Sequence, residues 1–166
     1  MNNRIEKQEG RWWQIAVLIV LAPLLLVIAV PALVLYLIYT GSLHFAVWIS
    51  WYARGRDVLF VYSDSPIWHD YITEYILPRL RDRAVILNWS QRRKWRFSLA
   101  RMAFHHFGGS REFNPLAVVF RPFRSTRTFR FWQPFRDYKH GDPEALHRME
   151  SEFFDLIEVH RHKNPA

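Results

Sequence analysis

The stretch WWQIAVLIVLAPLLLVIAVPALVLYLIYTGSLHFAVWISWYA, from Trp12 to Ala53, contains no Asp, Glu, Lys or Arg. A helix of about 20 apolar residues is long enough to cross the hydrocarbon core of a bilayer. We therefore predict one transmembrane helix over residues 12–40, preceded by a polar tail over residues 1–11. Gly41 is expected to end this helix, because glycine is common just beyond a helix C-terminus.

Two other interpretations of this stretch fit its length less well. The apolar region of a cleaved signal peptide has about 7 to 15 residues, whereas this run continues past Leu33 to Tyr39. A helical hairpin turning near Gly41 would leave Leu43–Ala53 for the return, about 16 Å, which cannot cross roughly 30 Å of hydrocarbon. One span is therefore expected, followed by an interfacial segment and linker over residues 41–56 that is rich in aromatic side chains.

A folded α/β domain is expected over residues 57–159. Val58–Tyr62 and Ala84–Leu87 are short apolar runs typical of buried strands, and each is followed by a stretch with helical spacing. Pro66 suits the first turn of the first helix, and Gln91–Phe107 is predicted to be the second. The order strand, helix, strand, helix favours parallel pairing with right-handed crossovers.

The rest of the domain is predicted to be a hairpin and a helix. Two further strands, Leu116–Phe120 and Arg127–Trp132, are separated by a short polar stretch and are expected to pair antiparallel. Asp142 and Pro143 open a last amphipathic helix, and residues 160–166 are expected to form a disordered tail. The fold class is therefore α/β: an N-terminal transmembrane helix followed by a small three-layer, Rossmann-like domain of about four strands, mostly parallel with a terminal antiparallel hairpin.

Composition limits the classes of function. The chain has 166 residues, no cysteine and a formal net charge of +8. Without cysteine there is no disulfide, no thiolate zinc site and no cysteine nucleophile. Beyond residue 11 the chain holds 20 basic and 13 acidic residues, a net charge of +7. This sign favours anionic partners.

Polar side chains follow the first two predicted strands. Ser63 and Asp64 come after the first, and Asn88 and Ser90 come after the second. Because ligands of open α/β sheets bind beyond the carboxyl ends of the strands, these four residues are a candidate pocket for a phosphate or carboxylate. The alternative is helix capping by the same residue types, since neither turn carries a glycine-rich phosphate loop.

The hairpin is the second candidate site. Arg121, Arg124, Arg127 and Arg130 alternate there with phenylalanines, and no acidic residue lies among them. Arginine and aromatic side chains together suit phosphate recognition in lipid headgroups and nucleic acids. Membrane lipid is the nearest phosphate to a tethered domain, so anionic lipid is favoured over nucleic acid. The alternative is that strand alternation buries the aromatics and leaves the arginines in water.

The sequence contains no strong catalytic, cofactor or metal motif, so we expect no cofactor and no metal site, and we assign no catalytic residue. The favoured function is a membrane-anchored binding or scaffolding module whose basic domain works at an anionic membrane face. Two alternatives stay open: a membrane-tethered hydrolase or transferase acting on a phosphate-bearing substrate, and a subunit of a larger membrane assembly with a membrane-protein partner. Whether the protein is an enzyme is left open.

The side of the membrane is a separate question. The arginine content and the lack of cysteine favour a domain on the cytoplasmic face of the cell membrane. The three basic residues that precede the span favour the opposite orientation, because basic residues close to a span are retained on the cytoplasmic side. We expect the cytoplasmic face for the domain.

Overall fold

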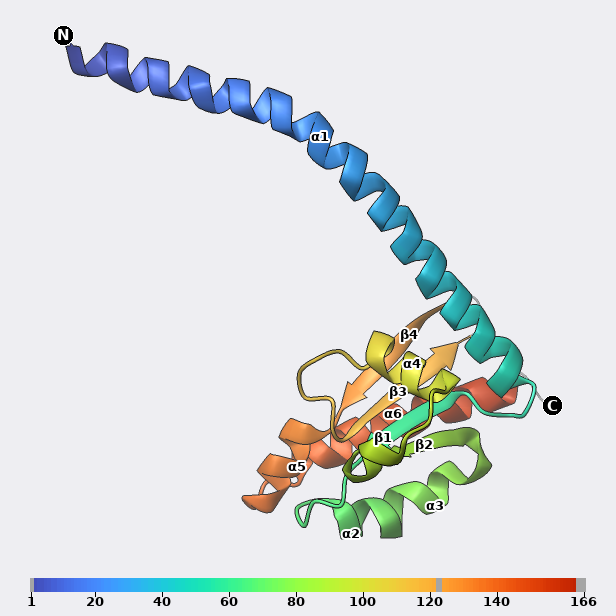
Figure 1. Ribbon diagram of the computed structural model, residues 1–166. Coiled ribbons are helices and arrows are strands. Elements are labelled where there is room, and N and C mark those ends of the chain that lie inside the picture. The colour runs from blue at the N-terminus through green and yellow to red at the C-terminus, as the bar shows by residue number, and fades with distance from the viewer. Residues whose placement is uncertain (1, 122–123, 164–166) are drawn as a thin grey trace. The chain divides into compact units, whose positions relative to one another are not determined.

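The fold is described from a computed structural model, in which residues 2–121 and 124–163 are placed. The chain divides into two compact units, residues 1–42 and 43–166. The first unit is the greater part of the long helix α1 (Asn2–Val47), and the second contains the end of α1 and a small α/β domain (Figure 1).

Helix α1 carries the apolar run of the sequence. Its described large apolar side chains from Ile19 to Tyr39 are all exposed, and Pro23 and Pro31 lie inside the helix. Among the described residues, Leu21–Tyr52 is the one helical stretch long and apolar enough to cross a membrane. The predicted N-terminal apolar helix is therefore present, and its length and composition suit a bilayer.

This helix does not end at Gly41, as the sequence suggested. It continues to Val47 and passes into a π-helical turn, Trp48–Tyr52, and the chain then turns at Gly55, whose φ is 70°. The amide of Gly55 donates to the carbonyl of Tyr52, and the amide of Arg56 donates to that of Trp51. These two bonds form a Schellman motif, which needs a residue with positive φ at the glycine position.

Tertiary packing explains why the helix continues. Leu43, Val47 and Trp51 are spaced four residues apart, so they lie on one helix face, and each is at most 6% exposed. Val47 and Trp51 pack with strand residues in a core cluster of the domain. The segment expected to lie along the membrane interface is therefore part of the folded domain.

The domain contains a four-stranded sheet in the order β2-β1-β3-β4 (Figure 1). Its strands are β1 (Val58–Tyr62), β2 (Ala84–Asn88), β3 (Leu116–Arg121) and β4 (Arg124–Arg130). Strand β1 pairs parallel with β2 and antiparallel with β3, and β3 pairs antiparallel with β4. The predicted parallel first pair and terminal hairpin are confirmed.

The predicted mostly parallel sheet is wrong, because β3 runs antiparallel to β1, and a Rossmann-like three-layer fold is not confirmed. The cause lies between β2 and β3. The predicted helix over Gln91–Phe107 is divided into a 3₁₀ segment η4 (Trp89–Lys94) and a nine-residue helix α4 (Leu99–Phe107). Helix α4 is about 13.5 Å long. Residues 108–115 can span up to roughly 26 Å. They can therefore bring the chain back to the end of the sheet at which β2 finished, and β3 then runs antiparallel to β1.

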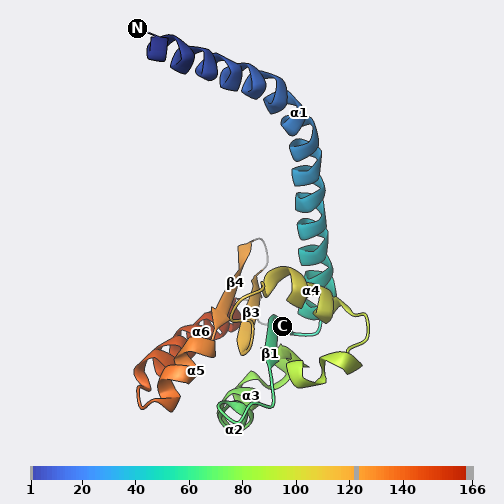
Figure 2. The ribbon, with the colours of Figure 1, turned by 60° about the vertical axis from the view of Figure 1, so that its left-hand side comes forward.

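Helical segments pack on both faces of the sheet. Along β1, Val58 and Phe60 join one core cluster while Leu59 and Val61 join the other, as expected from the alternation of side chains along a strand. Figure 2 shows α4 on one face and α6 (Glu144–Lys163) on the other. Both faces of the two central strands are thus buried.

The first crossover is a continuous helical stretch of changing pitch. It comprises α2 (His69–Tyr71), the π-helical η2 (Ile72–Ile76), α3 (Leu77–Leu80) and the 3₁₀ segment η3 (Arg81–Arg83). The helix begins at His69 rather than at Pro66. The carbonyl of Ser65 accepts from the amides of Trp68 and His69, so the preceding turn leads directly into it.

Two differences concern the C-terminal part of the chain. Helix α5 (Trp132–Lys139) follows β4 and was not predicted, since Trp132 was assigned to the strand. Helix α6 continues to Lys163, beyond residue 160, where the disordered tail was expected to begin. The last part of that expected tail, residues 164–166, lies outside the described residues.

Candidate functional site

The strand-end residues lie where the parallel strands β1 and β2 end side by side, with Tyr62 opposite Asn88. The side-chain amide of Asn88 donates from Nδ2 to Asp64 Oδ1 over 2.7 Å. Ser90 Oγ accepts from the backbone amide of Asp64 over 3.0 Å, and the Ser90 amide donates to Asn88 Oδ1 over 2.9 Å. The structure therefore brings together Asp64, Asn88 and Ser90, three of the four residues predicted to form the pocket.

Ser63, the fourth predicted residue, is buried and has a different partner. Its hydroxyl accepts from the indole of Trp68 over 3.2 Å. This bond fixes the turn between β1 and α2. The Ser63 side chain therefore supports the turn, and it makes no hydrogen bond with the other three residues among those that the structure describes.

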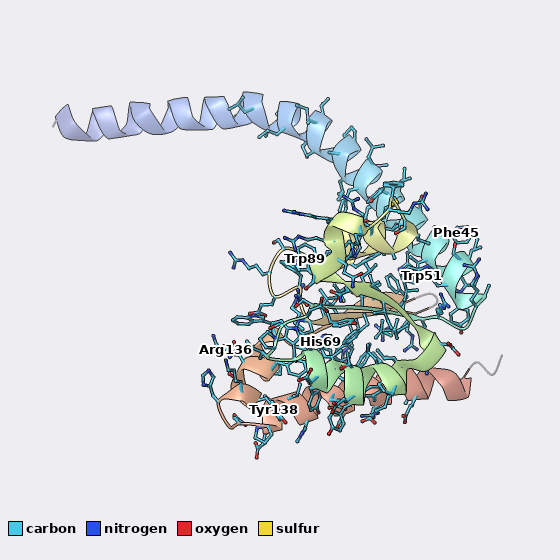
Figure 3. The ribbon with its side chains drawn as sticks, turned by 60° about the horizontal axis from the view of Figure 1, so that its bottom comes forward. Phe45, Trp51, His69, Trp89, Arg136 and Tyr138 are labelled. Atoms are coloured by element: carbon cyan, nitrogen blue, oxygen red, sulfur yellow. The ribbon has the colours of Figure 1, made fainter. Side chains whose placement is uncertain are left out.

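His69 adds an imidazole to the cluster (Figure 3). Its Nδ1 lies 3.6 Å from Asp64 Oδ1, and the two side chains are 38% and 47% exposed. The same Nδ1 is buried and has no hydrogen-bond partner among the described residues. The sequence placed His69 near Asp64 along the chain, and the start of α2 brings its ring to the carboxylate.

Tyr62 is a member of the cluster that the sequence did not single out. Its ring lies 6.2 Å from that of His69. Burial raises the pKa of its hydroxyl, and the charge of Asp64 raises it further, while a hydrogen bond from Asn88 acts in the opposite direction. The signal in the sequence was its position as the last residue of β1, at the edge where the polar residues follow.

The hydrogen bonds of the cluster chiefly join the two strand ends. Asn88 caps the start of η4 through Ser90, and its carbonyl accepts from the indole of Trp95 over 3.1 Å. Ser90 Oγ bonds the amide of Asp64, and no bond joins it to His69 among the described residues. The arrangement offers an acceptor at Asp64 and a proton-binding nitrogen at His69, without an assembled nucleophile and base.

The hairpin arginines do not form one continuous face. Arg127 and Arg130 are three residues apart on β4, so their side chains leave opposite faces of the sheet. Arg127 pairs with Glu152 of α6 over 2.9 Å, and Arg130 donates to the carbonyls of Arg111 and Glu112. These partners could not be predicted from the sequence, because they come from distant segments.

The other two hairpin arginines lie near the turn. Arg121 donates twice to the carbonyl of Ser125, over 3.1 and 2.7 Å. Arg124 is exposed, and its side chain makes no hydrogen bond or ion pair within residues 2–121 and 124–163. Arg124 is thus the hairpin arginine most available to an external anion.

Two further features bear on ligand binding. A cavity of about 10 Å³ is bordered by His44, Trp48, Arg56 and Arg121, which is room for one water molecule rather than a ligand. Within the described residues, no group of three His, Asp or Glu side chains could hold a metal ion. Neither feature identifies a cofactor site.

Comparisons with protein-family models, with curated proteins and with solved structures found no match to this chain. The function proposed below therefore rests on the residues and their geometry alone.

Proposed function

We propose that the protein is a membrane-anchored binding or scaffolding module whose basic domain works at an anionic membrane face. The observation that carries this proposal is the continuity of chain between the apolar helix and the domain core. The described large apolar residues of α1 are exposed up to Tyr39, and Leu43 is the first buried core residue among the described ones, with exposed Phe45 beyond it. Only residues 40–42 separate them along the chain, so a bilayer around the apolar run would keep the domain within a few residues of its headgroups.

The charge of the domain supports an anionic membrane face. Residues beyond the apolar run carry a net charge of +7, and each basic residue near an acidic leaflet contributes about 1 kcal/mol of attraction. In the hairpin, Arg124 is the best placed of the four predicted lipid contacts. Arg121, Arg127 and Arg130 keep their positive charge but already have intramolecular partners.

The test uses the full chain in lipid nanodiscs of two compositions, phosphatidylcholine alone and phosphatidylcholine with phosphatidylglycerol. Amide hydrogen exchange of the domain is compared between them. In the wild type, the amides of β4 are expected to exchange more slowly with the anionic lipid than with phosphatidylcholine alone. This slowing should be smaller in the Arg124→Gln variant. Equal exchange in both lipids throughout the domain would contradict the proposal.

We also propose the cytoplasmic face of the cell membrane for the domain. The support is its arginine content and the absence of cysteine. A reporter that is active only in the cytoplasm, fused after Ala166, is expected to be active. Activity of a reporter that works only on the other side would reverse the orientation.

The convergence of Asp64, His69 and Asn88 favours a second candidate, a membrane-tethered hydrolase or transferase for a phosphate-bearing substrate. His69 would transfer the proton of the attacking nucleophile or of the leaving group, and Asp64 would orient the His69 ring. The full chain in nanodiscs is assayed with a chromogenic phosphomonoester and with phosphatidic acid as substrates. Phosphate release that His69→Gln abolishes would support this candidate, and release unaffected by that substitution would exclude His69 as its base or acid.

A further inference from the structure

Phe97 is the most exposed large apolar side chain of the described residues, at 83%. It is more exposed than any described side chain of the apolar part of α1, whose highest value is 69% at Val27. A phenylalanine ring gains more from leaving water than most side chains do. A ring held out this far therefore marks a candidate contact surface.

The structure holds Phe97 in place rather than leaving it on a loose loop. It lies between η4 and α4, in a connection whose two ends are fixed. Trp95 packs its ring 5.7 Å from both Trp89 and Phe104, and its indole donates to the carbonyl of Asn88. Ser98 caps α4 by accepting from the amide of Arg101. Phe97 thus projects from a short, anchored bend.

Positive charge surrounds this ring. Between Asp82 and Glu112 the sequence contains no acidic residue. The bend and the adjoining turns carry five exposed cations, namely Arg92, Arg93, Lys94, Arg96 and Arg101. Unlike Arg127 of the hairpin, none of these five makes an ion pair with a carboxylate within the part of the chain that the structure describes. Their charge is available to an external anion.

We infer that the segment Trp89–Arg101 docks on an anionic lipid bilayer, with the ring of Phe97 in the interfacial region and the surrounding cations on headgroup phosphates. This surface is separate from the hairpin, and the inference rests on the proposed membrane attachment. An exposed aromatic ring beside clustered basic residues matches the two layers of a membrane surface, an apolar interior beneath an anionic plane. Arginine stems can lie along the apolar layer while their heads stay at the phosphates.

Single-stranded nucleic acid is an alternative ligand, because it combines negatively charged phosphates with aromatic bases. It is bound by aromatic platforms on which successive bases stack. Here Trp89 and Trp95 are half-buried against Phe104, which leaves one free ring and no platform. The exposed apolar helix of the same chain also makes lipid the nearest phosphate. These observations favour lipid.

The test exploits the absence of cysteine in the chain. A single cysteine replaces Phe97, and the full chain is labelled there with the fluorophore NBD, which restores an aromatic ring at this position. A matched chain carries the label at His140, an exposed residue at the end of α5. Both are reconstituted in phosphatidylcholine nanodiscs with and without phosphatidylglycerol.

The label at position 97 is expected to shift its emission to the blue with the anionic lipid and to be quenched by lipids that carry a quencher in the acyl chain. The label at position 140 is expected to show neither effect. Reversing two charges, Arg93→Glu with Arg96→Glu, should lower the equilibrium constant for docking on the anionic lipid by at least about tenfold and abolish the blue shift. Lys139→Glu with Arg148→Glu makes the same change in total charge elsewhere and should leave the shift intact.

Two outcomes would overturn the inference. One is a label at position 97 that stays in a polar environment while the protein is firmly integrated in the nanodisc, which refutes the docking surface and leaves the membrane anchor standing. The other is a shift produced by single-stranded RNA in phosphatidylcholine nanodiscs and not by phosphatidylglycerol, which assigns the surface to nucleic acid. Loss of the chain from the nanodisc would instead refute the proposed membrane attachment.

Discussion

At the scale of single residues, two ion pairs of the domain differ in burial. Asp57 and Arg83 are 8% and 23% exposed, and Arg83 also donates to the carbonyl of Ile157 over 2.8 Å. Glu152 and Arg127 are 54% and 49% exposed. A buried pair that loses one member leaves an uncompensated charge, whereas an exposed pair is replaced by water at little cost.

We therefore expect Asp57→Asn to lower the free energy of unfolding by about 3 kcal/mol. Glu152→Gln is the matched control and should change it by less than about 1 kcal/mol. Thermal unfolding of the full chain in detergent, followed by near-ultraviolet circular dichroism, measures both. Equal effects of the two variants would show that burial does not separate these pairs.

The second residue-scale prediction concerns Tyr71, whose hydroxyl donates to Glu150 over 2.7 Å. Burial raises the pKa of Tyr71 well above its ordinary value of 10.0, and the bond to Glu150 raises it further. The unfolded chain then releases this proton at lower pH than the folded chain does. The stabilisation is fully present below pH 10 and is lost as pH rises above it.

Alkaline solution should therefore destabilise the domain, and Tyr71→Phe should reduce this pH dependence because the substituted ring has no proton to lose. Melting temperatures of the full chain in detergent, taken from pH 8 to pH 11, measure the effect. This range runs from about two units below to about one unit above the pKa of an ordinary tyrosine. Tyr75→Phe, at an exposed neighbouring position, is the control. A wild-type melting temperature that does not fall above pH 10 would contradict this linkage.

At the scale of elements, the end of the long helix shows what the sequence could and could not reveal. Gly41 was the natural candidate for a C-cap, yet it lies inside α1, and no atom outside the helix lies within 4 Å of where its side chain would be. Gly55 ends the helical segment with a φ of 70°. The difference depends on burial of Val47 and Trp51 in the domain, which no local pattern reveals.

Gly55→Ala should destabilise the domain by about 1 kcal/mol, because an L side chain is strained at positive φ. Gly41→Ala should be neutral or stabilising, since alanine favours a helix interior over glycine by about 1 kcal/mol. Melting temperatures of both variants in detergent give the comparison. If Gly41→Ala were the more destabilising of the two, the helix would end where the sequence first suggested.

The strand arrangement was predictable only where it depends on neighbours in the sequence. The apolar runs of β1 and β2 with a helical stretch between them predicted their parallel pairing, and this pairing brought Asp64 close to Asn88. The direction of β3 goes with the break between η4 and the short helix α4, where Trp95 packs on Phe104. The partner of Arg127 was hidden from the sequence for a similar reason, since Glu152 reaches it from α6. Such long-range contacts have no periodic signature.

At the scale of the whole molecule, the apolar helix and the charged domain make different demands on their surroundings. The described side chains from Leu25 to Leu35 are exposed and apolar without exception. In water such a surface would be costly, at roughly 25 cal/mol for each Å² of apolar area. A bilayer removes this cost, and it tolerates the helix because the backbone hydrogen bonds are made within the segment, except at Pro23 and Pro31, which have no amide hydrogen.

Insertion can be tested by placing a charge in this helix. Leu25→Arg should oppose insertion by about 3 kcal/mol, because an arginine near the centre of a span must be drawn into hydrocarbon. Ser42→Arg puts the same side chain at the far end of the predicted span, where it can reach the interface, and should insert normally. Extraction of cell membranes with alkaline carbonate measures this: the wild type and Ser42→Arg should stay in the pellet, and the fraction of Leu25→Arg in the supernatant should rise. Because alkaline pH also weakens the domain through Tyr71, a parallel wash with concentrated salt at neutral pH, which screens surface charge and leaves the fold intact, separates loss of the anchor from loss of the fold. A wild-type chain released by both treatments would show that α1 does not span the bilayer.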